Sequence, residues 1–137
     1  MEDGTNLMGK KPFQLIITNL RAANLVIADL TASDPYIIFS IDGIRKCSTV
    51  IKYKNLNPSW VDEAYKIDII SPDGVLTLQV YDYDQGKDPD SLGSISLRFK
   101  ENMKNTAISE TLKDVRTGSV SFTLTISVIS SYDSYLL

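Results

Sequence analysis

Histidine is absent from the 137-residue chain, and Cys47 is its only cysteine. Without histidine the chain lacks the commonest general base and the usual ligand of zinc or copper. A carboxylate pair can perform glycosidase or aspartic-protease chemistry, but we expect no second lobe to form a substrate cleft, and the aspartates are flanked by loop residues instead of apolar side chains. We therefore expect a protein that is not an enzyme, with Cys47 as an ordinary strand residue.

Features of secreted and membrane proteins are also missing. One cysteine forms no disulfide within the chain, and no Asn-x-Ser/Thr acceptor with a permissible middle residue occurs. No apolar run approaches the roughly 18 residues of a membrane span, and residues 1–4 lack the layout of a secretory signal. These absences favour a cytoplasmic protein over an extracellular adhesion domain. A formal net charge of −3 argues against nucleic-acid binding.

The length of the chain suits one domain. A chain of 137 residues buries roughly two thirds of its unfolded surface, and 43% apolar with 23% charged residues is typical of globular domains. We expect a single domain over residues 12–130 that occurs as a monomer. Residues 1–11 and 131–137 are expected to be flexible termini.

Apolar and polar residues alternate along several segments, which is the period of a strand with one buried face. The clearest cases are residues 120–128 and 76–80, and Asp42-Gly43 marks a hairpin turn. Short strands separated by turns predict an all-β fold, here an eight-stranded antiparallel β-sandwich. Strands are expected near residues 13–19, 35–41, 44–50, 63–69, 75–82, 91–98 and 119–129, with a short strand or a helical turn around Glu110–Val115.

Two clusters of aspartates, about fifty positions apart, lie where strand-like segments give way to loops. Crowded carboxylates repel one another, so a cation is expected between them. Calcium takes about six to eight oxygen ligands in tolerant geometry, which aspartates on loops supply well. The alternative is that aspartate is simply a good turn residue. The clusters predict calcium binding by Asp29 and Asp34 in the first and by Asp82, Asp84 and Asp90 in the second.

Four ordered motifs surround these aspartates. They are DLTASDPY at residues 29–36, preceded by Asn24-Leu25, then LNPSW at 56–60, VYDYD at 80–84, and Leu92-Gly93. Their order and spacing resemble those of the C2 domain family, and the resemblance covers residues 13–129. It implies the antiparallel sandwich of that family, which occurs in two circular permutations. Because no strand-like segment precedes Phe13, we predict the permuted, type II topology.

The resemblance also implies which atoms bind calcium. Asp29, Asp82 and Asp84 would be shared by two ions, Asp34 and Asp90 would complete one site each, and the backbone carbonyls of Leu30 and Tyr83 would add ligands. The first loop has four residues between its aspartates, one fewer than synaptotagmin-like members, and resembles the short-loop forms of plants and protists. Lys87 stands where some members offer a serine to a third ion, so two calcium ions are expected.

The function implied is calcium-dependent binding to anionic phospholipids such as phosphatidylserine. Calcium would reverse the negative sign of the loop tips, and the chain would move from the cytoplasm to a membrane surface as a targeting or signalling module. Expected membrane contacts are Leu30, Thr31, Gln85, Gly86 and Lys87, which offer no aromatic wedge and predict headgroup-level docking. A phosphoinositide-binding basic patch is an open alternative to a solvated face for Arg45, Lys46, Lys52 and Lys54.

The competing hypothesis is a calcium-independent module of the same fold that binds a protein partner. The complete set of five acids argues against it, because a chain released from calcium binding is expected to carry lysine or asparagine at some of these positions.

Overall fold

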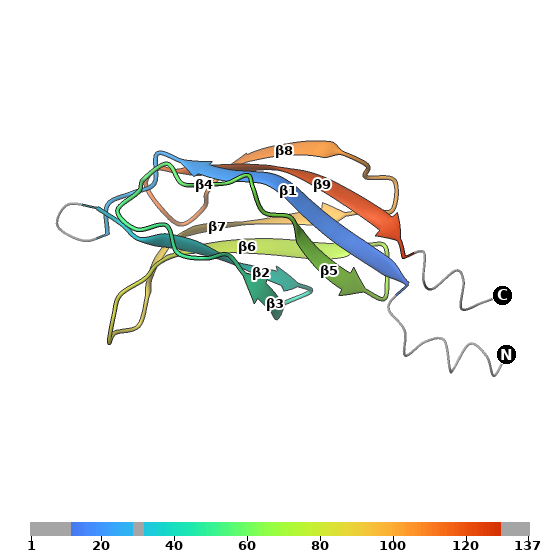
Figure 1. Ribbon diagram of the computed structural model, residues 1–137, viewed down its shortest axis with the longest axis horizontal. Coiled ribbons are helices and arrows are strands. Elements are labelled where there is room, and N and C mark those ends of the chain that lie inside the picture. The colour runs from blue at the N-terminus through green and yellow to red at the C-terminus, as the bar shows by residue number, and fades with distance from the viewer. Residues whose placement is uncertain (1–11, 29–31, 130–137) are drawn as a thin grey trace, which may run out of the picture.

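The computed structural model describes residues 12–28 and 32–129, which form two antiparallel sheets stacked face to face (Figure 1). No helix occurs within these ranges, and so none of the described segments is a helix able to cross a membrane. The strands are β1 (Phe13–Ala23), β2 (Pro35–Ile41), β3 (Ile44–Ser48), β4 (Ser59–Trp60), β5 (Tyr65–Ile69), β6 (Gly74–Asp82), β7 (Asp90–Phe99), β8 (Thr106–Thr111) and β9 (Ser119–Val128).

The first sheet has the order β4-β1-β9-β8, with β5 also pairing with β1, and the second has the order β3-β2-β6-β7. The predicted all-β antiparallel sandwich is confirmed. One strand was not predicted, the two-residue β4, in which Trp60 lies opposite Leu20 of β1. The predicted segment around Glu110–Val115 is displaced, because β8 covers Thr106–Thr111 and pairs with β9 alone.

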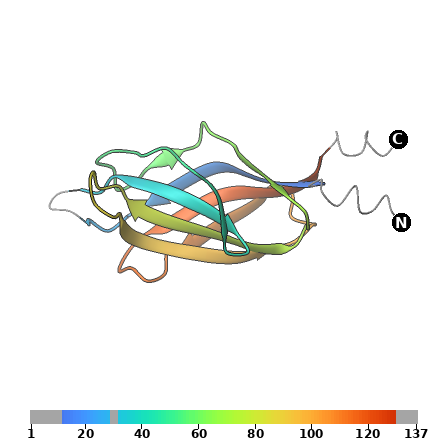
Figure 2. The ribbon, with the colours of Figure 1, turned by 90° about the horizontal axis from the view of Figure 1, so that it is seen from below.

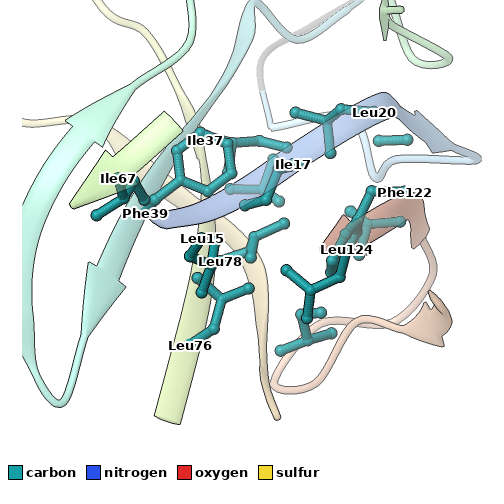
Figure 3. Close-up of a cluster of buried hydrophobic side chains, with 14 of the residues drawn as sticks. Leu15, Ile17, Leu20, Ile37, Phe39, Ile67, Leu76, Leu78, Phe122 and Leu124 are labelled. Carbon is teal, nitrogen blue, oxygen red and sulfur yellow. The ribbon is translucent and has the colours of Figure 1, made fainter. Parts of the chain in front are cut away.

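Side chains from both sheets meet between them and form the core. Along β6 the residues alternate between buried and half-buried, and Leu76, Leu78 and Val80 are all fully buried. Leu15 and Ile17 of β1 point into the same space from the other sheet (Figure 3). This alternation explains the fold, because a strand can bury only every second side chain against the opposite sheet.

The chain enters the sandwich through β1, which pairs along most of its length with β9, the last strand. β1 also leads directly into the connection that carries the first aspartate cluster. The assignment to the type II permutation stays a prediction.

The connections between strands gather at two ends of the sandwich. Figures 1 and 2 both place the connections after β3 and β6, and the described parts of the connection after β1, at one end, which we call the aspartate end. The β2–β3 turn at residues 42–43, the β5–β6 turn at 70–73 and the β7–β8 connection at 100–105 lie at the opposite end, the far end.

Candidate functional site

Asp82 is the last residue of β6 and lies in the middle of the aspartate end. In the sheet register it pairs with Pro35 of β2 on one side and with Asp90 of β7 on the other. Its side chain is completely buried. Its Oδ1 atom accepts a hydrogen bond of 2.6 Å from the backbone N–H of Asp34. A residue of the second predicted cluster therefore contacts a residue of the first directly.

Asp34 precedes β2 and is half-buried. Its carbonyl oxygen accepts a hydrogen bond of 2.9 Å from the N–H of Tyr83. Its Oδ1 atom accepts a hydrogen bond of 2.7 Å from the N–H of Lys54 in the β3–β4 connection. Asp34 thus joins three connections at this end of the sandwich, and its position is determined by backbone groups that are far apart in sequence.

Asp84 lies in the β6–β7 connection, and Asp90 directly follows it. Asp84 is half-buried and its carbonyl oxygen accepts a hydrogen bond of 3.2 Å from the N–H of Lys87, while Asp90 is the exposed first residue of β7. Between them Gln85, Gly86 and Lys87 are all exposed, as membrane-contacting residues must be.

The remaining predicted ligands and membrane contacts belong to the first loop. These residues, Asp29, Leu30 and Thr31, lie outside the described residues. Within 12–28 and 32–129, no group of three or more histidine, cysteine or acidic side chains is arranged to hold a metal ion. The potential donors at the aspartate end are nevertheless carboxylate and carbonyl oxygens on loops and at the ends of strands. These oxygen donors match the ligand preference of calcium, which favours hard oxygen ligands. They do not match zinc, which favours nitrogen and sulfur.

Sequence reasoning missed the role of Ser33. Its side chain is 1% exposed, and its Oγ atom accepts a hydrogen bond of 2.9 Å from Ala28 N–H and donates one of 2.9 Å to the Val26 carbonyl. Its carbonyl accepts a hydrogen bond of 3.0 Å from the N–H of Asn55. Ser33 therefore links the two described parts of the β1–β2 connection, which lie on either side of residues 29–31. No local pattern signals this role, because a serine in a loop is normally solvated.

The four residues of the predicted basic patch are divided between two places. Arg45 and Lys46 are exposed on β3, whereas Lys52 and Lys54 belong to the β3–β4 connection. The N–H of Lys52 donates to the Pro35 carbonyl at 2.9 Å and that of Lys54 donates to Asp34, so these two lysines lie at the aspartate end.

Burial changes the pKa of two side chains in the second sheet. Tyr36 faces Tyr81 across the β2–β6 pair, with ring centroids 5.8 Å apart. Burial raises the pKa of Tyr36, the neighbouring Tyr81 raises it further, and Arg45 lowers it, so the phenol stays neutral at physiological pH. Burial also raises the pKa of the half-buried Cys47 thiol, which disfavours the reactive thiolate.

Known proteins share this sequence and this fold. The sequence model of the C2 domain family matches residues 13–114. The chain is 32% identical to protein C2-DOMAIN ABA-RELATED 5 of Arabidopsis thaliana over 100 residues, 73% of this chain and 48% of the relative. It is 40% identical to Synaptotagmin-3 of Arabidopsis thaliana over 96 residues, 66% of this chain and 18% of that relative. The chain thus spans less than half the length of these relatives.

Solved structures agree with the sequence comparison. A C2 domain of plant Extended Synaptotagmin 1 superimposes with a TM-score of 0.75 at 26% identity, over 88% of this chain and 98% of that one. A calcium-bound structure of two C2 domains of Extended-Synaptotagmin 2 has a TM-score of 0.63 at 26% identity, over 84% of this chain and 46% of that one. The chain belongs to the C2 domain family.

Proposed function

We propose that this domain binds bilayers containing anionic phospholipids in a calcium-dependent manner, through its aspartate end. Membership of the C2 family and relatives named as synaptotagmins support a membrane-targeting or signalling module. The calcium-bound structure of a relative supports calcium as the cofactor. The observation that carries the proposal is the hydrogen bond from Asp34 N–H to Asp82 Oδ1, because it joins the two aspartate clusters at one end.

In this proposal the aspartates hold two calcium ions and create a switchable surface. Asp29, Asp82 and Asp84 would each bind both ions, Asp34 and Asp90 would complete one site each, and the carbonyls of Leu30 and Tyr83 would contribute further oxygens. Bound calcium supplies positive charge and coordination positions that lipid headgroup oxygens can fill. Without the ions, the carboxylates repel the anionic cytoplasmic leaflet.

The coupling between calcium and membrane must be reciprocal. If calcium strengthens membrane binding by some factor, the membrane strengthens calcium binding by the same factor. The domain would therefore stay in the cytoplasm at resting calcium and move to a membrane surface when calcium rises. It acts in this proposal as a binding module without an enzymatic activity of its own.

A calcium titration by calorimetry, with and without vesicles containing phosphatidylserine, tests the proposal. We expect two ions to bind with intrinsic dissociation constants of roughly 10⁻⁵ to 10⁻⁴ M, since exposed loops bind more weakly than the closed sites of calcium buffers. Vesicles should tighten binding. If no calcium is taken up at millimolar concentration, and vesicles or a protein partner bind equally in chelator, the calcium-independent interaction module is the correct alternative.

A further inference from the structure

We infer that the β3–β4 connection, residues 49–58, is a third membrane-contacting segment, with Tyr53 as an aromatic anchor at the level of the lipid headgroups. The inference rests on the proposed function, and its partner is the same anionic bilayer. It adds an exposed aromatic side chain to a surface whose predicted membrane contacts, Leu30, Thr31, Gln85, Gly86 and Lys87, include none.

Three N–H groups of the connection donate hydrogen bonds to residues 33–35 at the aspartate end. Asn55 N–H donates to the Ser33 carbonyl at 3.0 Å, Lys52 N–H to the Pro35 carbonyl at 2.9 Å, and Lys54 N–H to the Asp34 carboxylate at 2.7 Å. Figures 1 and 2 show the connection, in green, running to the same end of the sandwich as the β6–β7 connection. Its position relative to the aspartates is therefore determined by the fold.

Tyr53 lies at this end with most of its surface open. Its side chain is 64% exposed, yet its ring contacts that of Tyr83 edge to face, with centroids 6.3 Å apart and planes at 87°. Tyr83 itself stands between Asp82 and Asp84. An exposed aromatic ring supported by a second ring loses little freedom on binding. Tyrosine also suits the membrane interface, because its ring is apolar and its hydroxyl stays hydrated.

The neighbours of Tyr53 strengthen the match to an anionic bilayer. Lys52 and Lys54 flank it directly, and Lys54 is exposed. Each lysine near an anionic membrane surface contributes favourable electrostatic attraction. Val50, in the same connection, is 63% exposed. The segment therefore combines an aromatic ring, an aliphatic side chain and two cations beside the proposed calcium ligands, a composition that fits headgroups and the upper acyl region better than water.

A tryptophan reporter tests this contact directly. The only native tryptophan, Trp60, is 1% exposed, so its emission should not respond to vesicles. Tyr53→Trp places an indole at the proposed contact, and Ile70→Trp places one at the far end, where Ile70 is 61% exposed. With calcium and phosphatidylserine vesicles, we expect emission of Tyr53→Trp to shift to shorter wavelength and to be quenched by brominated lipids. Emission of Ile70→Trp should do neither.

Co-sedimentation of the same variants separates the inference from the function on which it rests. If both variants sediment with calcium but Tyr53→Trp shows no shift and no quenching, the connection does not contact the membrane and the inference is wrong while the function stands. If neither variant nor the unmodified chain sediments with calcium, both are wrong. Tyr53→Ser should weaken vesicle binding about fivefold, whereas Ile70→Ser should leave it unchanged; equal effects would also contradict the inference.

Discussion

The two ends of the sandwich both carry aspartates, but they use them differently. At the far end Asp42, Asp68 and Asp73 are exposed. Asp42 Oδ1 accepts a hydrogen bond of 2.9 Å from the N–H of Val75 in β6, and Asp68 Oδ1 accepts one of 3.1 Å from the Gln14 side chain. These aspartates perform ordinary turn and surface roles.

At the aspartate end Asp82 is fully buried, and it binds the backbone of a connection that is 48 positions away in the sequence. Burying a carboxylate is costly unless it is paired or binds a metal. The far end instead presents an apolar hollow of about 240 Å³, lined in part by Ile41, Ile69 and Phe99. Full burial of the carboxylate, together with its hydrogen bond to the other aspartate cluster, therefore distinguishes Asp82 from the exposed aspartates of the far end.

Two glycine substitutions should give the largest difference between the ends. Gly93 of β7 has a φ of 103°, and an added Cβ would lie 2.6 Å from Val115 Cγ1 and 3.0 Å from the Lys113 carbonyl. Gly43 in the far-end turn has a φ of 83° with nothing within 4 Å of the added atom. Gly93→Ala should lower the free energy of unfolding by about 3 kcal/mol and Gly43→Ala by about 1 kcal/mol, measured by urea denaturation. Equal losses would contradict this packing.

Calcium binding should raise the free energy of unfolding by nearly as much as Gly93→Ala lowers it. A ligand that binds only the native state adds about 2.7 kcal/mol when present at a hundredfold excess over its dissociation constant. We expect the melting temperature to rise by several degrees between chelator and millimolar calcium. Magnesium should do much less, because it resists dehydration and prefers octahedral geometry. Equal stabilisation by the two ions would indicate general charge screening.

Matched substitutions of aspartate compare the two ends in calcium affinity. Asp84→Asn removes one charge from a proposed shared ligand, while Asp42→Asn removes one charge at the far end and keeps an oxygen able to accept the hydrogen bond from Val75. Calorimetry should show calcium affinity at least about tenfold weaker for Asp84→Asn, which is about 1.4 kcal/mol. Asp42→Asn should change it little. Similar losses for both would mean that only the overall charge matters.

The smallest effect is expected for the titration of Tyr65, which lies away from both ends and serves as a reference for them. Burial, followed by the charges of Glu63 and Cys47, raises the pKa of Tyr65 to about 12. The folded chain therefore keeps this phenol protonated where the unfolded chain ionises, so the free energy of unfolding should fall as pH rises from about 10 towards 12. Tyr65→Phe should reduce this fall in denaturation measurements, to the same extent with and without calcium. A dependence on calcium would place the titrating groups at the aspartate end.

Regular alternation made most of the sandwich predictable from the sequence. The expected segments at 35–41 and 119–129 agree closely with β2 and β9. The Asp42-Gly43 turn also forms as expected, with φ values of 49° and 83°, the left-handed conformation that hairpin turns favour. The motifs also led to Asp34 and Asp82 in separate clusters, which a hydrogen bond joins in the structure; calcium binding by the five aspartates stays a prediction.

The elements that were missed depend on contacts that local patterns do not encode. β8 contains few apolar residues and has a single partner, so its strand character comes from pairing with β9. The connection at 49–58 is placed by hydrogen bonds to Ser33, Asp34 and Pro35. Nothing near Tyr53 in the sequence indicates that its ring would lie against Tyr83.

The most direct test of calcium binding at the aspartate end is a calcium titration followed by backbone amide NMR. We predict saturable shifts of the amides around Asp34, Asp82, Asp84 and Asp90, with those around Asp42, Asp68 and Asp73 unchanged. Such a result would place calcium at one end of the sandwich. Shifts of equal size at both ends, or none at millimolar calcium, would contradict the claim that the aspartate end is the calcium-dependent site.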